Sequence, residues 1–394
     1  MPRALEGIRV LDFTEVLAGP FCAMLLGDMG ADVIKVERPG RGDGVRGNDP
    51  FVQGESYPFT MVNRNKRSIT INLKHPRSRE ILEPLIRQAD IFIENFRPGT
   101  MERLGLGYDA VSALNPRIIY CSISGFGQTG PYRQRGGFDL IAQAMGGLMS
   151  VTGEPGGPPT KAGYPVADLG TAMFGVYGIL SALYAREKTG VGQHIDVSLF
   201  ETTIAWSVWH AARYFGSGEI PGPLGSAHPL NAPYQAFQTR DSYIVIAAIT
   251  QEMWEKLCRL LEREDLITDP RFREANDRLR NIQVLAPILQ ERFLTRTAEE
   301  WLAELTRLGI PCGPINTLDK VFADPQARAR GMVAELDQPL AGKIPTVGFA
   351  AKLSRTPAQI WRHAPLLGEH TREILLSLGY SEEQIAELEK EQVI

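Results

Sequence analysis

Short runs of β-branched and aromatic residues alternate with helical patterns over residues 1–126. The runs that predict strands are bounded by turn residues and cover 7–14, 31–37, 68–73, 89–96 and 117–124. Between them, apolar positions recur at helical spacing over 21–30, 77–89 and 100–116. Because β and α elements alternate, we predict a parallel sheet covered by helices, with ligands bound at the carboxyl ends of the strands.

The rest of the chain shows a different order of elements. Helices are predicted over 138–149, 168–186 and 196–215, and a loop of linker composition follows over 216–229. Later come a strand at 243–248, charged amphipathic helices, two short strands at 332–337 and 342–348, and terminal helices. We therefore predict a large α/β domain over 1–215, a small α+β domain over 225–330, and a C-terminal return to the large domain over 331–394.

Composition and charge indicate a soluble cytoplasmic protein. The 42 basic and 46 acidic residues give a formal net charge of −4, which argues against nucleic acid or an anionic membrane as the main partner. The four cysteines form no CxxC pair, and the first residues lack the apolar run of a signal peptide. The apolar stretch Leu169–Ala185 is marginal for a membrane span, and we interpret it as a buried central helix.

Motifs for nucleotide, metal and serine chemistry find little support. GxGxxG occurs at 42–47 and 125–130, but neither match opens a helix, as a dinucleotide fingerprint requires. GxSxG, HExxH and the Walker pattern are absent, and the six histidines show no ligand spacing. We therefore expect no metal and no permanently bound cofactor.

Two features remain open to more than one interpretation. One is a set of basic residues: Arg38, Lys74 and Arg97 follow predicted strands, and Arg103 lies a turn into the next predicted helix. They could bind phosphates, but ordinary solvated charges give the same pattern. Asp168 precedes an apolar helix, where aspartate is a good N-cap, but a carboxylate at this junction could equally act as a nucleophile.

Distinctive blocks follow one another along essentially the whole chain. They are GIRVLDFTEVLAGPFCAMLLGDMGADVIKVERPGRGD, NRNKRSITINLK, ENFRPGTMERLGLGY, SISGFGQTGPY, GEPGGPPTKAGYPVADLGT, KTGVGQHIDVSLFE, PYQAFQTRDSYIVIA, GIPCGPINT and APLLGEHT. In this order they resemble the family III CoA-transferases, a group that includes formyl-CoA:oxalate transferase, carnitine CoA-transferase and α-methylacyl-CoA racemase.

The resemblance implies a set of site residues and an architecture. The family nucleophile falls on Asp168. The implied CoA-binding positions are Leu17, Ala18, Arg38, Ile71, Asn72, Leu73, Lys74, Asn95, Phe96, Arg97, Arg103, Gly136, Gly137, Phe138 and Asp139. The implied fold is a Rossmann-like large domain joined to a small domain by long linkers, with two ring-shaped chains interlocked in a homodimer.

The resemblance also implies CoA transfer between an acyl-CoA and a carboxylic acid, both bound as substrates. One thioester replaces another, so the reaction is nearly isoenergetic. The Asp168 carboxylate would attack the acyl-CoA, forming an anhydride and releasing CoA thiolate, which would then attack the aspartyl carbonyl to give an aspartyl-CoA thioester. The acceptor acid would reverse these steps.

Two departures from the family patterns reduce the number of reactions that the resemblance implies for this chain. Racemases pair the aspartate with a histidine, but this chain has Phe138 at that position, so one proton-shuttling group is missing. The formyl-CoA:oxalate enzymes carry four successive glycines in a loop over the site, where this chain reads GSAHPLNAPYQAF. We therefore expect succinyl-CoA as donor and a dicarboxylate such as glutarate, malate or mesaconate as acceptor. A racemase, a formyl-CoA:oxalate transferase and a non-catalytic acyl-CoA-binding protein are the alternatives.

Overall fold

The computed structural model describes residues 3–394 and divides the chain into two compact units. The large unit contains the residues up to Gly147, then Gly163–Trp206 and Pro325–Ile394. The small unit contains Leu148–Ala162 and Ser207–Asp324. The last seventy residues therefore belong to the same compact unit as the N-terminal segment.

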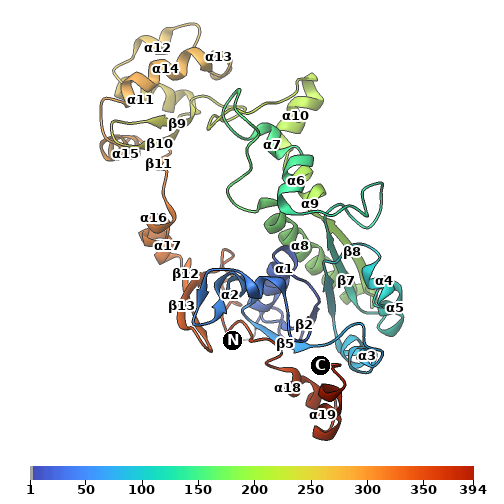
Figure 1. Cartoon of the computed structure of the whole chain (residues 1–394). Coiled ribbons are helices and arrows are strands. Elements are labelled where there is room, and N and C mark those ends of the chain that lie inside the picture. The colour runs from blue at the N-terminus through green and yellow to red at the C-terminus, as the bar shows by residue number, and fades with distance from the viewer. Residues whose placement is uncertain (1–2) are drawn as a thin grey trace. The chain divides into compact units, whose positions relative to one another are not determined.

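Six parallel strands form the central sheet of the large unit (Figure 1). In spatial order they are β5 (Lys66–Thr70), β2 (Asp32–Glu37), β1 (Arg9–Asp12), β6 (Ile91–Glu94), β7 (Ile119–Ser124) and β8 (Gln193–Ser198). After β1 the chain adds strands on one side, and from β6 onward it adds them on the other. The loops after β1 and β6 therefore diverge and open a crevice at the carboxyl ends of these strands, where open α/β sheets bind ligands.

Helices cover both faces of this sheet because successive strand residues point into two different cores. Val10 and Ile93 belong to the core shared with α1 (Ala18–Asp28) and α8 (Val166–Thr189). Leu11 and Phe92 belong to the opposite core, shared with α3 (Ser78–Gln88), α5 (Tyr108–Leu114), α18 (Thr371–Ser377) and α19 (Glu382–Lys390). Burial on both faces is typical of parallel sheets. The predicted α/β fold with a parallel sheet is confirmed.

The pattern-based helix over 196–215 is wrong at its start. Residues Gln193–Ser198 form β8, and the helices begin only with α9 (Leu199–Ala205) and α10 (Val208–Ser217). As an edge strand, β8 leaves Gln193 and His194 exposed, so its sequence lacks the apolar run of a buried strand. The helix predicted over 100–116 is also interrupted, into α4 (Thr100–Arg103) and α5, because Gly105 adopts a φ of 67° between them.

α8 is the described helix that is long and apolar enough to cross a membrane by length and composition. It packs against α1, β7 and β8, and its buried residues, Ala172 and Ile179 among them, join the core on that face of the sheet. It ends at Gly190, which adopts a φ of 77°. The structure thus places the expected central helix over Val166–Thr189, and we interpret it as a core helix.

The small unit is built on the antiparallel sheet β11-β10-β9, formed by β9 (Tyr234–Gln238), β10 (Tyr243–Ala247) and β11 (Cys312–Pro314). Trp254 and Trp301 are almost fully buried in its core. The helices of this unit are α7 (Leu148–Val151), α10, α11 (Gln251–Leu260), α12 (Asp265–Thr268), α13 (Ala275–Arg280), α14 (Ile282–Phe293), α15 (Ala298–Arg307) and α16 (Leu318–Ala323).

The remaining elements of the large unit are short. They are the 3-10 helix η1 (Gly44–Gly47), the hairpin β3 (Phe51–Val52) and β4 (Glu55–Ser56), α2 (Tyr57–Asn63), α6 (Asp139–Met145), α17 (Pro325–Ala329), and the antiparallel pair β12 (Val333–Gln338) and β13 (Gly342–Val347). The last pair confirms the two short strands predicted near the C-terminus.

Candidate active site

The crevice between β1 and β6 contains a pocket of about 220 Å³ in which Asp168 lies. Its walls are the loops after β1, β6 and β7, the first turn of α8 and the start of α9. Of the residues implied by the family resemblance, it brings together Leu17, Ala18, Asn95, Phe96, Arg97, Gly136, Gly137, Phe138 and Asp168. Side chains that no motif singles out also line it, namely Glu15, Val16, Pro98, Ile123, Ser124, Arg135 and Leu199.

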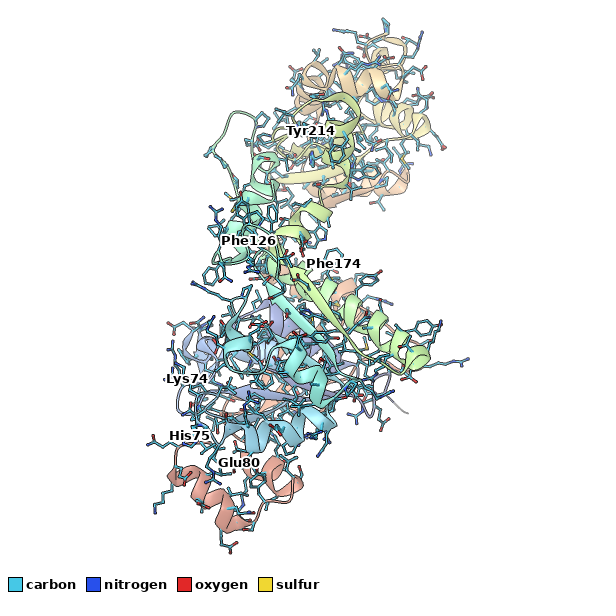
Figure 2. All side chains as sticks on the ribbon, turned by 90° about the vertical axis from the view of Figure 1, so that its right-hand side faces the viewer. Lys74, His75, Glu80, Phe126, Phe174 and Tyr214 are labelled. Atoms are coloured by element: carbon cyan, nitrogen blue, oxygen red, sulfur yellow. The ribbon has the colours of Figure 1, made fainter. Side chains whose placement is uncertain are left out.

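Three basic residues implied to bind CoA lie outside this pocket. Arg38 and Lys74 are exposed just beyond the ends of β2 and β5, and Arg103 is exposed at the end of α4. Figure 2 shows Lys74 at the surface, apart from Phe126 in the loop after β7. Their charged groups are accessible to solvent or phosphate, and Nη2 of Arg103 also donates to Oγ1 of Thr100 at 3.0 Å.

The segment after β5 is hydrogen-bonded to the C-terminal residues. Ile71 is fully buried in the core, and Leu73 packs against that core. The backbone N–H of Asn72 donates to the carbonyl of Val393 at 2.7 Å. Only Lys74 of this implied segment is exposed, whereas Ile71 has no exposed surface and its N–H donates to the carbonyl of Glu37 at 2.8 Å.

Asp168 is the third residue of α8, and its side chain is half-buried. The N-cap position is Pro165, without a capping side-chain hydrogen bond, so the N-cap interpretation of Asp168 is wrong. Burial, and then the nearby charge of Asp139, raise the pKa of Asp168 to about 7. A carboxylate that is poorly solvated and close to its pKa at neutral pH is suited to act as a nucleophile.

Asp139 at the start of α6 supplies the cap that α8 lacks. Its Oδ1 accepts hydrogen bonds from the backbone N–H of Ala167 at 2.8 Å and of Asp168 at 3.3 Å. Its Oδ2 accepts one from Nε2 of Gln143 at 2.6 Å. The first turn of a helix has N–H groups without intrahelical partners, and Asp139 satisfies two of them from another helix. Its carboxylate therefore positions Asp168.

We predict that Asp139→Asn shifts the acid limb of the kcat/KM profile to lower pH. Asparagine keeps an oxygen acceptor for the N–H groups of α8 but removes the charge that helps raise the pKa of Asp168. Because the reacting form is the carboxylate, a lower pKa keeps the variant active at more acidic pH. The pH profile of kcat/KM measures this, since it reports ionisations of the free enzyme. An acid limb at the wild-type pH would show that the Asp139 charge does not act on the nucleophile.

The loop Thr14–Leu17 forms one wall of the pocket and holds a strained backbone. Val16 adopts a φ of 73°, which is unusual for a β-branched residue. Its N–H donates to Oδ1 of Asp43 at 3.2 Å. The side chain of Asn95 binds both the N–H and the carbonyl of Glu15, at 2.9 and 2.7 Å. Strain that its surroundings impose in this way is characteristic of functional sites.

A buried charge cluster, defined by Asp12, Lys35, Asp43 and Lys66, anchors this loop. Lys35 Nζ donates to the carbonyl of Thr14 at 2.6 Å and lies 3.0 Å from Oδ2 of Asp43. Lys66 Nζ lies 2.7 Å from Oδ2 of Asp12. Burial lowers the pKa of Lys66 to about 8, whereas around Lys35 the neighbouring carboxylates outweigh burial and raise its pKa. The cluster thus pairs its buried charges with one another.

Two glycines allow the loop after β7 to close on itself beside the pocket. A Cβ on Gly137 would lie 2.5 Å from Cα of Gly125, and one on Gly125 would lie 2.7 Å from Cα of Gly137. Such distances are too short for any side chain, so both positions require glycine. The first glycine of the second GxGxxG match therefore serves close backbone packing.

Comparisons with known proteins identify the family of this chain. A family model described as CoA-transferase family III matches residues 5–371. Succinyl-CoA:glutarate CoA-transferase from Mus musculus is 43% identical over 388 residues, which cover 98% of this chain and 89% of that protein. Succinyl-CoA:mesaconate CoA-transferase from Haloarcula marismortui is 42% identical and covers 95% of this chain and 96% of its own.

The fold is also similar to solved structures. A CAIB/BAIF family protein from Brucella suis superposes with a TM-score of 0.85 at 40% identity, over 96% of this chain and all of its own. The family model spans both compact units, and the relatives align over nearly their whole length. The chain therefore belongs to CoA-transferase family III and is a CoA-transferase.

Proposed function

We propose that this enzyme transfers CoA from succinyl-CoA to a dicarboxylic acid, with Asp168 as the covalent nucleophile. The observation that carries the proposal is the Asp168 carboxylate. It is half-buried in the pocket between β1 and β6, and Asp139 accepts hydrogen bonds from the backbone around it. Relatives that act on succinyl-CoA with glutarate or mesaconate, at 42–43% identity, support the donor and the acceptor class.

In the first step an Asp168 oxygen attacks the thioester carbonyl of succinyl-CoA. The carbon–sulfur bond breaks, and its electron pair leaves with the CoA thiolate, so that a mixed anhydride forms between Asp168 and the succinyl group. A carboxylate is suited to this step because the anhydride keeps the acyl group activated. In the second step the thiolate attacks the aspartyl carbonyl, which releases succinate and leaves an aspartyl-CoA thioester. The acceptor carboxylate then reverses both steps.

The start of α1 can stabilise the negative charge that develops in these steps. Its N-cap residue, Leu17, makes no capping side-chain hydrogen bond, and its first turn holds no acidic residue. The N–H groups at such a helix start have no intrahelical acceptor and attract anions. Because Leu17 and Ala18 line the pocket, we propose that their N–H groups face the reacting carbonyl.

CoA itself is proposed to extend from the pocket to the carboxyl edge of the sheet. Its reactive end would be held by the implied residues that line the pocket, namely Leu17, Ala18, Asn95, Phe96, Arg97, Gly136, Gly137 and Phe138. Arg38, Lys74 and Arg103, all exposed, would meet its phosphates, because guanidinium and ammonium groups bind phosphate well. CoA is thus a substrate, with no permanently bound cofactor. Ile71, Asn72 and Leu73 would support this edge, and Asp139 would act through Asp168.

A panel of donors and acceptors tests the proposed reaction. The purified enzyme is incubated with succinyl-CoA, acetyl-CoA or formyl-CoA and with glutarate, mesaconate, malate or oxalate, and acyl-CoA products are identified by mass spectrometry. The proposal expects the highest kcat/KM for succinyl-CoA with a dicarboxylate of the first three. Preferred turnover of formyl-CoA with oxalate would instead make it a formyl-CoA:oxalate transferase.

A racemase is less well supported by the site. Phe138 stands where the racemases carry their histidine, and its side chain is 70% exposed at the start of α6. No histidine is among the described residues that line the pocket with Asp168. Loss of optical purity of a 2-methylacyl-CoA without any acceptor acid would favour the racemase.

We propose further that two chains form an interlocked homodimer in the cytoplasm. The exposed face of α8 carries an apolar stripe at helical spacing, Met173, Tyr177, Leu180 and Tyr184, which are 61%, 71%, 43% and 67% exposed. A second copy would cover such a stripe. Mixing tagged with untagged dimers tests the interlocking, because subunits that are threaded together exchange only after unfolding. Prompt formation of hybrid dimers would contradict it.

A further inference from the structure

Two arginines share the pocket with the nucleophile. Arg97 follows β6, and Arg135 lies in the long loop between β7 and α6. Both are exposed, and neither forms an ion pair with a carboxylate of the described residues. The other charged groups that line the pocket are the carboxylates of Glu15 and Asp168. The pocket therefore offers two guanidinium groups to an incoming anion.

The two arginines differ in their surroundings. The Arg97 guanidinium packs on Gly136, where a Cβ would lie 3.3 Å from its Nη2, and Arg97 belongs to the segment that the family resemblance assigns to CoA. Arg135 lies 4.3 Å from the centre of the Tyr132 ring, a cation–π contact that orients it and leaves the donors of its fork unused. It also stands four residues before Asp139, which holds Asp168.

A dicarboxylic substrate poses a specific electrostatic problem in this pocket. One carboxyl group reacts at Asp168, and the other stays ionised beside the carboxylates of Glu15 and Asp168. Like charges at close range repel one another, and the repulsion is stronger around a partly buried carboxylate such as Asp168 than in bulk water. A guanidinium fork that binds the second carboxylate in bidentate fashion removes this cost.

We propose that Arg135 binds the distal carboxylate of the dicarboxylic acyl group and thereby selects dicarboxylic over monocarboxylic substrates. This inference rests on the proposed function and assigns its specificity to one side chain. Arg97 keeps its proposed role in binding CoA. An acyl group that ends in a methyl group gains nothing from Arg135 and has to desolvate it.

The test compares Arg135→Gln with Arg133→Gln. Arg133 lies in the same loop but lines a separate pocket without Asp168, so it serves as the matched control. The rate of the first turnover is measured with succinyl-CoA and with butyryl-CoA, which share CoA and differ at the distal carboxylate. For Arg135→Gln we expect a loss of about 10- to 100-fold with succinyl-CoA, the size of one charge-assisted hydrogen-bond pair, and less than threefold with butyryl-CoA. Arg133→Gln should change neither rate.

Equal losses with both thioesters, or no loss with succinyl-CoA, would overturn the inference. Arg135→Lys should recover part of the preference, because it restores the charge without the fork. Calorimetric binding of glutarate and of butyrate to the CoA-loaded enzyme separates this inference from the proposed reaction. If no turnover occurs with any acid, weaker glutarate binding by Arg135→Gln alone still supports the role of Arg135, and unchanged glutarate binding overturns it.

Discussion

Replacing Asp168 by alanine or asparagine is expected to lower CoA transfer by more than about a thousandfold, the loss that follows removal of a covalent nucleophile. Neither replacement has a carboxylate that can form the anhydride or the aspartyl-CoA thioester. The measurement is the steady-state rate of CoA transfer from succinyl-CoA to glutarate. A tenth of wild-type activity in Asp168→Ala would show that another group carries the chemistry.

The stability of Asp168→Asn serves as the control for folding. In the folded state the pKa of Asp168 is about 7, well above its value of 3.8 without a protein environment. The folded protein thus holds this proton more tightly than the unfolded chain, so wild-type stability falls as pH rises from about 4 to 7. Asparagine does not ionise, and the variant should melt above the wild type at pH 8, with the gap closing toward pH 4. A gap that is independent of pH would contradict the raised pKa.

Lys35→Met is expected to lower the free energy of unfolding by about 3–5 kcal/mol, the cost of breaking a buried ion pair by removing one partner. The side chain of Lys35 is fully buried, and its loss leaves Asp43 without a cation and the Thr14 carbonyl without a donor. This is a large share of the ordinary stability of a domain, about 5–15 kcal/mol. Chemical denaturation followed by circular dichroism measures it, and CoA binding should weaken because the loop Thr14–Leu17 loses an anchor.

Two further variants separate the charge effect from a change in size. Lys390→Met alters an exposed lysine and should change stability by no more than about 0.5 kcal/mol. Adding Asp43→Asn to Lys35→Met removes the unpaired charge and should restore part of the stability. A Lys35→Met single variant as stable as the wild type would show that Lys35 does not compensate the buried carboxylates.

The sequence predicts the sheet well where both faces of a strand are buried, and it misses the exposed edge strand β8. Ile91–Glu94 and Ile119–Ser124 are fully buried strands with clear apolar runs. β8 is missed because its pattern of mixed burial follows from its position at the edge, which is a property of the assembled sheet. No local pattern distinguishes such a strand from the start of the helix that follows it.

The candidate site, too, could be predicted only in part from the sequence. Spacing alone leaves Asp168 between N-cap and nucleophile. The structure excludes the N-cap, because the residue lies within the helix with Pro165 at the cap, and the nucleophile stays a proposal. The role of Asp139 follows from hydrogen bonds to residues 28 and 29 positions away, which no motif encodes. Val16 and Arg135 enter the pocket through the fold of their loops, so sequence patterns give no sign of them.

The covalent intermediate is the central claim, and intact-mass analysis of the enzyme after incubation with succinyl-CoA alone tests it most directly. Without an acceptor acid, the aspartyl-CoA thioester should accumulate, and peptide mapping should place the CoA adduct on Asp168. Hydroxylamine should convert that thioester to a hydroxamate, release CoA and inactivate the enzyme, while Asp168→Asn should gain no mass. An unchanged mass and full activity after both reagents, in enzyme that transfers CoA when acceptor is added, would contradict the covalent mechanism.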